Sequence, residues 1–437
     1  MDEYASATEI ARRVRRGELS AETVVAETVE RIESRSDGAY VWVGAERARR
    51  RARAVDERVA SGESVGPLAG VPVAVKDLYG FVEGAPQTFG SQLFADNVAD
   101  ENSVFVDRLE AAGAVVIGMT NTPEFGHKGV TDNALHGPTR NPFDPARNPG
   151  GSSGGSAAAL AAGTAAVAHG GDAGGSLRIP AAWSGVYAIK PTYRRVPAVG
   201  RPNGFGGQTG TFVHYGPMAR TVADAAVALD VMSGPHPRDP TTLPATDERF
   251  ADAVGRGIEG LRVGYTPDYG AYPVDERVRE TVSEAVEAFA DAGATVERVE
   301  IALGYDHERL TEVWRTLSGV GFAAMADRLA DEEGVDLLGR REAIADEFAA
   351  MIERGQATSG PEFYALGSVK TAVFDAFRDA FDAYDLVVGP TVTHPPVANA
   401  DRAGRTLGPS EVAGESVDPT IGWCPTYLQN FTGHPAA

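Results

Sequence analysis

The sequence has few of the residues that build disulfide frameworks, metal centres or nucleic-acid surfaces. Cys424 is its single cysteine, so no intrachain disulfide can form, and we expect a small buried side chain there. The eight histidines are scattered, with no H-E-x-x-H motif and no Cys/His cluster, which argues against a metal site. His169, near the glycine-rich region, is interpreted as a buried histidine with satisfied hydrogen bonds rather than as a catalytic base. The net charge of −21, from 40 basic and 61 acidic residues, disfavours binding to nucleic acid or an anionic membrane.

Long apolar runs and a basic leader are also absent from the sequence. No run, the alanine-rich residues 157–168 included, reaches the roughly 18 residues that a membrane-spanning helix needs. The chain begins with the acidic sequence Met-Asp-Glu-Tyr, unlike a secretory signal. We therefore expect a cytoplasmic protein, and the large acidic excess indicates a halophilic one. Lysine is scarce, so a lysine at an apolar position is unusual here; the four are Lys76, Lys128, Lys190 and Lys370.

Helical and strand patterns alternate along most of the chain. The helix–glycine–strand order at residues 103–119 returns at residues 278–301, and such units favour a largely parallel sheet covered by helices. Serine at position 20 is placed to cap a helix. The predicted helices are 6–16, 20–34, 46–61, 103–112, 156–168 and 278–292, and the predicted strands are 71–75, 115–119, 261–265, 295–301 and 386–388.

A proline-rich segment, residues 234–240, could divide the chain into two domains. We interpret it as a loop within one domain, because strands 261–265 and 386–388 are expected to join the same buried sheet. Residues 307–382 are expected to be mostly helical and to pack over one end of that sheet. The predicted fold is thus α/β, a single large mixed, mostly parallel twisted sheet flanked by helices, in one domain of residues 1–437 with a helical region at 1–65.

Two clusters of glycine and serine flank an apolar stretch in the middle of the chain. No residue between Arg147 and Asp172 carries a formal charge; residues 150–156 are Gly-Gly-Ser-Ser-Gly-Gly-Ser, and residues 172–176 are Asp-Ala-Gly-Gly-Ser. The helix predicted between them has no polar face and therefore belongs in the interior. Glycines let backbone N–H groups turn towards a ligand, so we expect the two serine-bearing loops to meet deep in the fold.

Several residues in these segments allow more than one interpretation. Lys76 ends an apolar strand, where burial would lower its pKa and make it a base, but an ion pair with Asp77 is the alternative. Ser152 and Ser153 match the G-x-S-x-G nucleophile elbow, yet prolines replace the strand that an elbow requires, and either serine could cap a helix. The N–H groups of residues 174–176 suit an oxyanion hole, an anion-binding nest or a turn.

Taken together, these segments resemble the amidase signature family. The segments that carry the resemblance, in the family's order, are residues 73–77, 120–125, 150–156, 172–181 and 190–192. The similarity extends from the first helices to about Ala437. It implies the family's large mixed sheet and its Ser-cisSer-Lys triad, whose members here are Ser176 as the nucleophile, Ser152 as the bridging serine after a cis peptide, and Lys76 as the base.

The resemblance assigns further roles. The N–H groups of Ala173, Gly174 and Gly175, with that of Ser176, would form the oxyanion hole. The residues expected to support the site are Ser153, Asp172 and Arg178. The candidates for the substrate pocket are Asn121, Trp183, Gln208, Trp423 and Tyr427. The family usually has threonine where this chain has Gly171, and related chains generally continue beyond position 437, so we expect C-terminal strands of the sheet to be missing.

The predicted activity is that of an amidase that hydrolyses a carboxamide to a carboxylate and ammonia or an amine, without a metal or cofactor. One alternative is the amide-hydrolysing subunit of a glutamine-dependent tRNA amidotransferase, which would need partner subunits. A second is a truncated, non-catalytic homologue. The expected partner is a small-molecule amide, with no direct contact to nucleic acid or membrane, and a homodimer is the candidate assembly.

Overall fold

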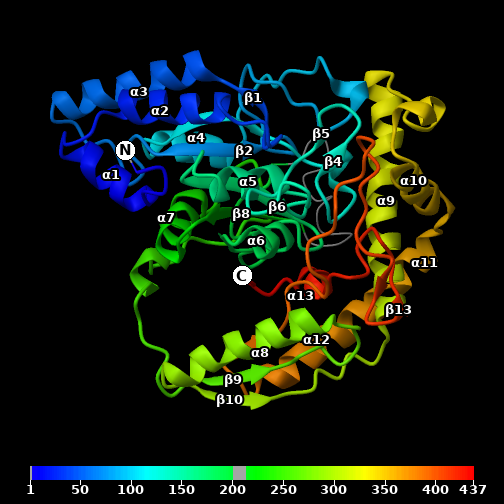
Figure 1. Ribbon diagram of the computed structural model, residues 1–437. Helices are drawn as coiled ribbons and strands as arrows, with labels where there is room; N and C mark the ends of the chain where they lie inside the picture. The colour runs from blue at the N-terminus through cyan, green and yellow to red at the C-terminus, as the bar shows by residue number, and fades with distance from the viewer. Residues whose placement is uncertain (1, 200–212) are drawn as a thin grey trace.

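The computed structural model describes residues 2–199 and 213–437, and a mixed six-stranded sheet lies at its centre (Figure 1). The strand order is β1-β3-β2-β6-β8-β7; β3, β2 and β6 run parallel, and the outer pairings are antiparallel. The mixed sheet flanked by helices is confirmed. Its strands are β1 Tyr40–Val43, β2 Pro72–Lys76, β3 Val115–Thr120, β6 Val167–Asp172, β7 Tyr187–Ala188 and β8 His214–Ala219.

Strands β2 and β3 are almost entirely apolar because helices cover both faces of the sheet. Every residue of β2 and β3 is buried, and β2 alternates between two hydrophobic clusters, Val73 and Val75 facing one and Ala74 the other. The N-terminal helices are confirmed close to their predicted bounds and pack on the first face together with α4. These helices are α1 Ala7–Arg15, α2 Ala21–Glu33, α3 Ala45–Ala60 and α4 Val104–Ala111.

The alanine-rich segment between the two glycine clusters contains both a helix and a strand. The buried helix α5 (Gly154–Ala161) is confirmed, but it is shorter than predicted, because Gly163 turns the chain with φ 67° and β6 begins at Val167. Val167 then pairs with Val73 of β2. The prediction of one helix through residue 168 is therefore wrong, since an apolar run fits a buried helix and a buried strand equally well.

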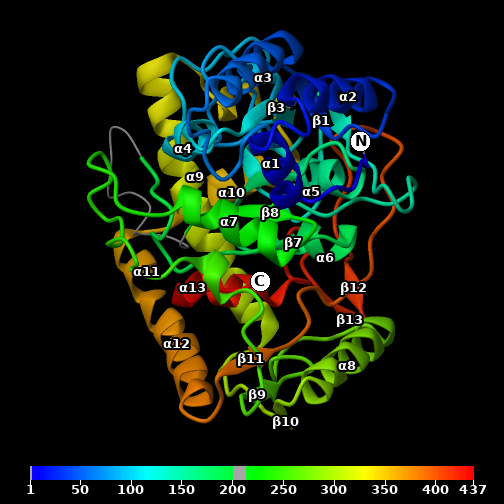
Figure 2. The same ribbon diagram turned by 90° about the vertical axis from the view of Figure 1, so that its left-hand side faces the viewer.

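A second, fully parallel sheet lies apart from the first one (Figures 1 and 2). Its order is β10-β9-β11, with β9 Arg262–Tyr265, β10 Thr295–Arg298 and β11 Leu386–Val388; helix α8 (Glu276–Asp291) connects β9 to β10. The strands occur where they were predicted, but their expected place in the main sheet is wrong. An apolar run predicts a strand without specifying its partners; here β9 and β10 pair within one local β–α–β unit, and β11 joins β9 from a distant part of the chain.

Helices fill most of the segment 307–382, as predicted. The pair α9 (His307–Glu333) and α10 (Asp346–Ala357) covers one end of the main sheet, where Phe348 stacks on Phe125 just beyond β3, with ring centroids 5.3 Å apart. In contrast, α12 (Gly367–Phe381) packs beside the second sheet. The remaining elements are α6 Arg178–Ser184, α7 Val222–Met232, α11 Gly360–Ala365, α13 Leu428–Thr432, β4 Asp132–Asn133, β5 Gly137–Pro138, β12 Glu411–Val412 and β13 Glu415–Ser416.

The fold can be compared with what the sequence indicates about Cys424 and about membrane-spanning helices. Cys424 is completely buried, as expected. Across residues 2–199 and 213–437, no helix combines the length and the apolar character needed to cross a membrane.

Candidate active site

Lys76 stands at the carboxyl end of β2, and its side chain is only 1% exposed. Its Nζ lies 2.6 Å from Ser152 Oγ, within hydrogen-bonding distance. The carboxylate of Asp77 faces another segment, accepting hydrogen bonds from the Thr88 backbone N–H at 2.8 Å and from Gln87 Nε2 at 3.1 Å. The structure therefore favours the pairing of Lys76 with serine over the alternative ion pair with Asp77.

Burial controls the protonation of Lys76. Loss of hydration lowers the pKa of the Lys76 amine to about 7, although the negative charge of Asp172 opposes the shift. A large fraction of the amine is therefore neutral near pH 7, and a neutral amine can accept a proton from the hydroxyl of Ser152.

Ser152 follows a cis peptide bond from Gly151, at the start of α5, and its side chain is buried. No strand precedes it, so Ser152 does not lie on a nucleophile elbow, as the prolines before it predict. The next residue, Ser153, joins the two glycine-rich loops, because its backbone N–H donates to the carbonyl of Ser176 at 3.1 Å. The two serine-bearing loops therefore meet inside the fold, as the sequence predicts.

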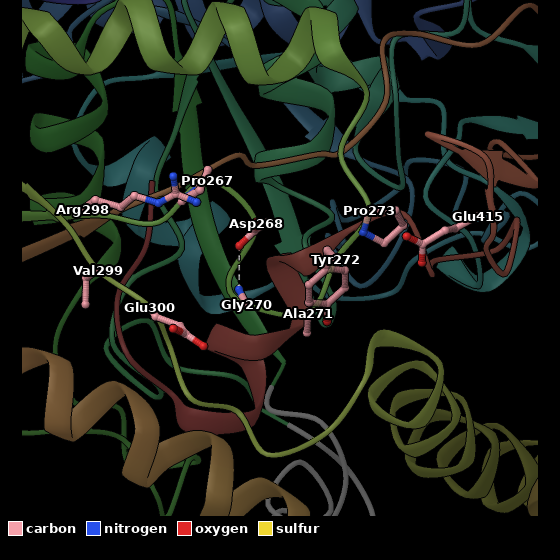
Figure 3. A pocket seen from close by; sticks show the side chains of 10 residues that line it. All are labelled: Pro267, Asp268, Gly270, Ala271, Tyr272, Pro273, Arg298, Val299, Glu300 and Glu415. Carbon is pink, nitrogen blue, oxygen red and sulfur yellow. Dashed lines mark hydrogen bonds between the residues drawn. The ribbon is translucent and has the colours of Figure 1, made fainter.

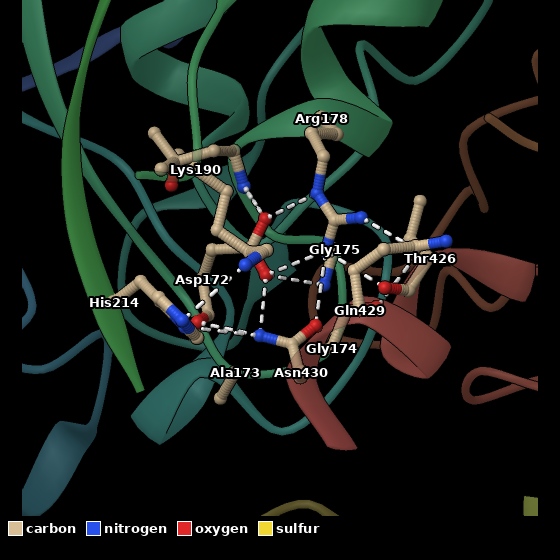
Figure 4. Close-up of polar contacts among 12 residues, drawn as sticks. Asp172, Ala173, Gly174, Gly175, Arg178, Lys190, His214, Thr426, Gln429 and Asn430 are labelled. Atoms are coloured by element: carbon tan, nitrogen blue, oxygen red, sulfur yellow. Dashed lines mark hydrogen bonds and ion pairs between the residues drawn. The ribbon is translucent and has the colours of Figure 1, made fainter. Parts of the chain in front are cut away.

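Asp172 anchors the second loop, residues 172–176 (Figure 4). Both of its carboxylate oxygens lie 3.0 Å from nitrogens of the Arg178 guanidinium, and they also accept the N–H groups of Gly175 and Leu177 at 2.8 and 3.2 Å. Burial alone would raise the pKa of Asp172, but the Arg178 guanidinium holds it well below its usual range. The carboxylate therefore stays ionised and braces both ends of the loop.

This bracing changes the predicted oxyanion hole. The Gly175 N–H is committed to Asp172, so Gly175 is a poor donor for a substrate oxygen. The donors that we retain are the N–H groups of Ala173, Gly174 and Ser176. Ser176 itself is partly exposed, whereas Ser152 is 2% exposed, so Ser176 carries the hydroxyl that a substrate can approach.

The predicted pocket residues lie in the packed interior. Trp183 stacks on Trp423 with ring centroids 4.7 Å apart, and the amide of Asn121 donates to Gly137 and Thr139. The hydroxyl of Tyr427 lies 2.8 Å from that of Tyr272, also within the core. These four residues hold structural contacts. Gln208 lies outside the described residues.

His169 is buried, as expected, but the prediction that its ring nitrogens are hydrogen-bonded is wrong. Its ring stacks on Phe105 at 3.9 Å between centroids, and within the described part of the chain neither ring nitrogen has a hydrogen-bond partner. Burial lowers the pKa of His169 well below its ordinary value, so the ring is neutral.

An open hollow of about 390 Å³ lies elsewhere, at the carboxyl ends of β9 and β10 (Figure 3). Asp268, Tyr272, Arg298 and Glu300 contribute to its lining, and none of the predicted site residues does. In the described ranges, no group of three or more His, Cys, Asp or Glu side chains is arranged to hold a metal ion.

The sequence analysis did not identify three residues that contact the 172–176 loop. They are Trp314, Thr426 and Asn430, which lie 141 to 258 residues away from their partners in the loop and belong to no local motif.

The fold and the site together are those of a hydrolase that cleaves amide C–N bonds. The family model described as Amidase matches residues 23–437, and the chain belongs to the amidase signature family. It is 34% identical over 436 residues to an acylamidase of Rhodococcus erythropolis, covering 99% of this chain and 87% of that one. It is 35% identical to a glutamyl-tRNA(Gln) amidotransferase subunit of Carboxydothermus hydrogenoformans, covering 90% and 83%.

Solved structures agree with this assignment. A bacterial aryl acylamidase of the amidase signature family superposes with a TM-score of 0.95 at 39% identity, covering 99% of this chain and 88% of that one. A 6-aminohexanoate cyclic dimer hydrolase complexed with substrate gives a TM-score of 0.87 at 29% identity, covering 100% and 89%. The predicted family and amide-hydrolysing activity are thus confirmed.

The pKa of Lys76 predicts how activity depends on pH. Because only the neutral amine accepts a proton, kcat/KM should rise with pH, reach half its maximum near pH 7 and level off above it. The pKa values of Asp77 and Lys190 also lie near 7, so thermal unfolding is measured at each pH to separate loss of fold from protonation of Lys76. A profile that falls or stays flat through neutrality in a folded protein would contradict a lysine base.

Proposed function

We propose that this amidase hydrolyses acylated aryl amines through an acyl-enzyme on Ser176. One observation carries the acyl-enzyme mechanism, namely the 2.6 Å contact between the buried Lys76 Nζ and Ser152 Oγ. A lysine with a pKa near 7 and a bridging hydroxyl can activate a second serine without histidine or metal.

The chemistry follows from this arrangement. Ser152 passes its proton to neutral Lys76 as it takes the proton of Ser176, whose oxygen attacks the amide carbon. The N–H groups of Ala173, Gly174 and Ser176 hold the negative oxygen of the tetrahedral intermediate. Lys76 returns the proton through Ser152 to the leaving amine, the C–N bond breaks, and an ester forms. Water, activated by the same pair, then cleaves the ester to a carboxylate and free Ser176.

The aryl substrate is proposed from the names of similar proteins, and an aromatic cluster lies behind the backbone that approaches the serines. A Cβ added to Gly126 would lie 3.3 Å from Ser152 Oγ, so this backbone approaches the site closely. The preceding residue, Phe125, stacks on Phe89 with ring centroids 5.4 Å apart and on Phe348 at 5.3 Å. Phe125 and Phe348 are at most 4% exposed, so this cluster packs behind the backbone that approaches the site and does not itself line an open cavity. The two similar proteins whose names point to the substrate class are an acylamidase and an aryl acylamidase.

The amidotransferase subunit is the second candidate. The relative from Carboxydothermus hydrogenoformans, 35% identical, favours it, but the solved structure of the corresponding Thermotoga maritima protein superposes with a TM-score of 0.71, against 0.95 for the aryl acylamidase. We therefore propose an enzyme that works without amidotransferase partner subunits. The net charge of −21 supports a cytoplasm of high salt as its location.

An activity screen tests the proposal. The purified protein is offered an acetanilide, an aliphatic amide and glutamine in molar salt, with Ser176→Ala as the blank. We expect release of aniline by the wild-type protein alone. Ammonia from glutamine only when partner subunits are added would favour the amidotransferase. No turnover of any amide, together with no covalent labelling by a fluorophosphonate, would leave the non-catalytic homologue.

A further inference from the structure

The 172–176 loop has a hydrogen bond on every one of its carbonyl groups. Two come from nearby backbone: the Ile179 N–H donates to Gly175 O at 2.7 Å, and the Ser153 N–H donates to Ser176 O at 3.1 Å. The carbonyls of the first three residues accept from side chains of distant segments. The loop is thus fixed from outside by elements that belong to other parts of the fold.

Those three donors are buried and come from α9 and from the C-terminal segment. Trp314 Nε1, on α9, donates to Ala173 O at 3.0 Å. Thr426 Oγ1 donates to Gly174 O at 2.7 Å, and Asn430 Nδ2 donates to Asp172 O at 3.0 Å. Trp314, Thr426 and Asn430 are at most 5% exposed. Figure 4 shows Thr426 and Asn430 reaching the loop from the C-terminal segment.

Peptide geometry converts these bonds into an orientation of the N–H groups. In a planar trans peptide the carbonyl oxygen and the following N–H point in opposite directions. A donor on the carbonyl of residue 173 therefore turns the N–H of Gly174 away from Trp314, and Asn430 orients the N–H of Ala173 in the same way. The next peptide is held at both ends, by Thr426 on its oxygen and by Asp172 on the N–H of residue 175.

The two glycines of the loop match this close approach. A Cβ on Gly174 would lie 2.7 Å from Trp314 Nε1, and a Cβ on Gly175, whose φ is 124°, would lie 2.0 Å from Thr426 Oγ1. The tryptophan and the threonine thus sit directly against the backbone, where only glycine leaves room for them.

We propose that Trp314 and Thr426, assisted by Asn430, are positioning residues for the oxyanion hole. Trp314 aims the N–H of Gly174, and Asn430 that of Ala173, at the oxygen of the tetrahedral intermediate. Thr426 holds the next peptide plane and thereby keeps the rest of the loop, with the N–H of Ser176, in place. The inference rests on the proposed function, since it concerns the same loop. Oxyanion donors act because they are already oriented before charge develops, so loosening the peptide planes weakens them without removing any donor.

The test removes each hydrogen bond while keeping the side chain's shape. Thr426→Val lacks the hydroxyl and Thr426→Ser keeps it; Trp314→Phe keeps an aromatic ring and lacks the N–H. Because misplacement of a catalytic group by 1 Å can cost about 100-fold, we expect Thr426→Val and Trp314→Phe to lower kcat about 10- to 100-fold. KM should change little, and Thr426→Ser should restore most of the activity.

A transition-state mimic separates positioning from structural damage. A trifluoromethyl ketone forms a tetrahedral oxyanion adduct with a serine, so its affinity should fall by the same factor as kcat/KM. The rising limb of the pH profile should stay near pH 7, because Lys76 is untouched. The control Thr164→Val removes a buried hydroxyl that donates to Ala159 O at 3.0 Å, just before β6 and at the opposite end of that strand from the loop, and should keep wild-type kcat.

The outcomes distinguish the two proposals. Wild-type kcat and wild-type ketone affinity in folded Thr426→Val and Trp314→Phe would overturn the positioning role. If Ser176→Ala is inactive in the same assay, the proposed function still stands. Full activity in Ser176→Ala would overturn the proposed function itself. If Thr426→Val fails to fold, Trp314→Phe together with Thr426→Ser decides the question.

Discussion

Replacing Lys76 with methionine is expected to abolish amide hydrolysis at neutral pH while the protein stays folded. Methionine keeps an unbranched stem in the buried site but cannot accept the proton that Ser152 relays. Loss of one member of a catalytic unit in serine hydrolases costs on the order of 10⁴- to 10⁶-fold in kcat, and we expect a loss of that size. The measurement is the single-turnover rate of acylation, followed by release of aniline from an acetanilide.

Stability should not decrease in this variant. The native protein holds an amine whose pKa is lowered by burial, so between about pH 7 and its unfolded pKa the unfolded chain binds more protons than the folded one. The contribution of the neutral Lys76 amine to folding stability is fully present above the unfolded pKa and is lost as pH falls through about 7. Methionine does not titrate, so the variant lacks this pH dependence of stability. Lys370→Met, at a half-buried lysine of α12, is the matched control and should keep full activity. A Lys76→Met enzyme with wild-type acylation would refute the lysine base.

Replacing Ser176 with alanine is expected to have a comparable effect and to identify the nucleophile. Ser152 is the serine that lies against Lys76, but it is 2% exposed, whereas Ser176 is partly exposed. Ser176→Ala should therefore lose both hydrolysis and labelling by a fluorophosphonate. Ser152→Ala should lose hydrolysis yet retain slow labelling at Ser176, because its hydroxyl is still present and only the relay is missing.

Mass spectrometry of the labelled peptide decides between the two serines. Labelling at Ser152 in the Ser176→Ala protein would reverse the two roles. Ser156→Ala serves as the control, since Ser156 is also a buried serine near the start of α5, but its Oγ lies 2.7 Å from Thr120 Oγ1 and donates to the carbonyl of His169 at 2.9 Å. It should label and turn over like the wild-type enzyme, apart from a modest loss of stability.

The local elements of the fold could be predicted, because they depend on short-range periodicity. The helices of the first 65 residues, the strand before Lys76 and the helix–glycine–strand units all occur close to their expected positions. The assignment of strands to one sheet or the other could not be predicted in this way. The strand after α5 continues an alanine-rich run, and β9 and β11 form their own sheet, because pairing depends on which segments meet in space.

The sequence by itself determined the family and the candidate triad of Lys76, Ser152 and Ser176, because the glycine–serine loops and the buried lysine are local patterns. Only the tertiary structure decided that Asp77 turns away from Lys76 and that the Gly175 N–H donates to Asp172. It also decided that Trp314 and Thr426 donate hydrogen bonds to the carbonyls of the 172–176 loop. Those contacts join segments up to 252 residues apart, and hydrogen bonds of that range are set by packing rather than by any spacing along the chain.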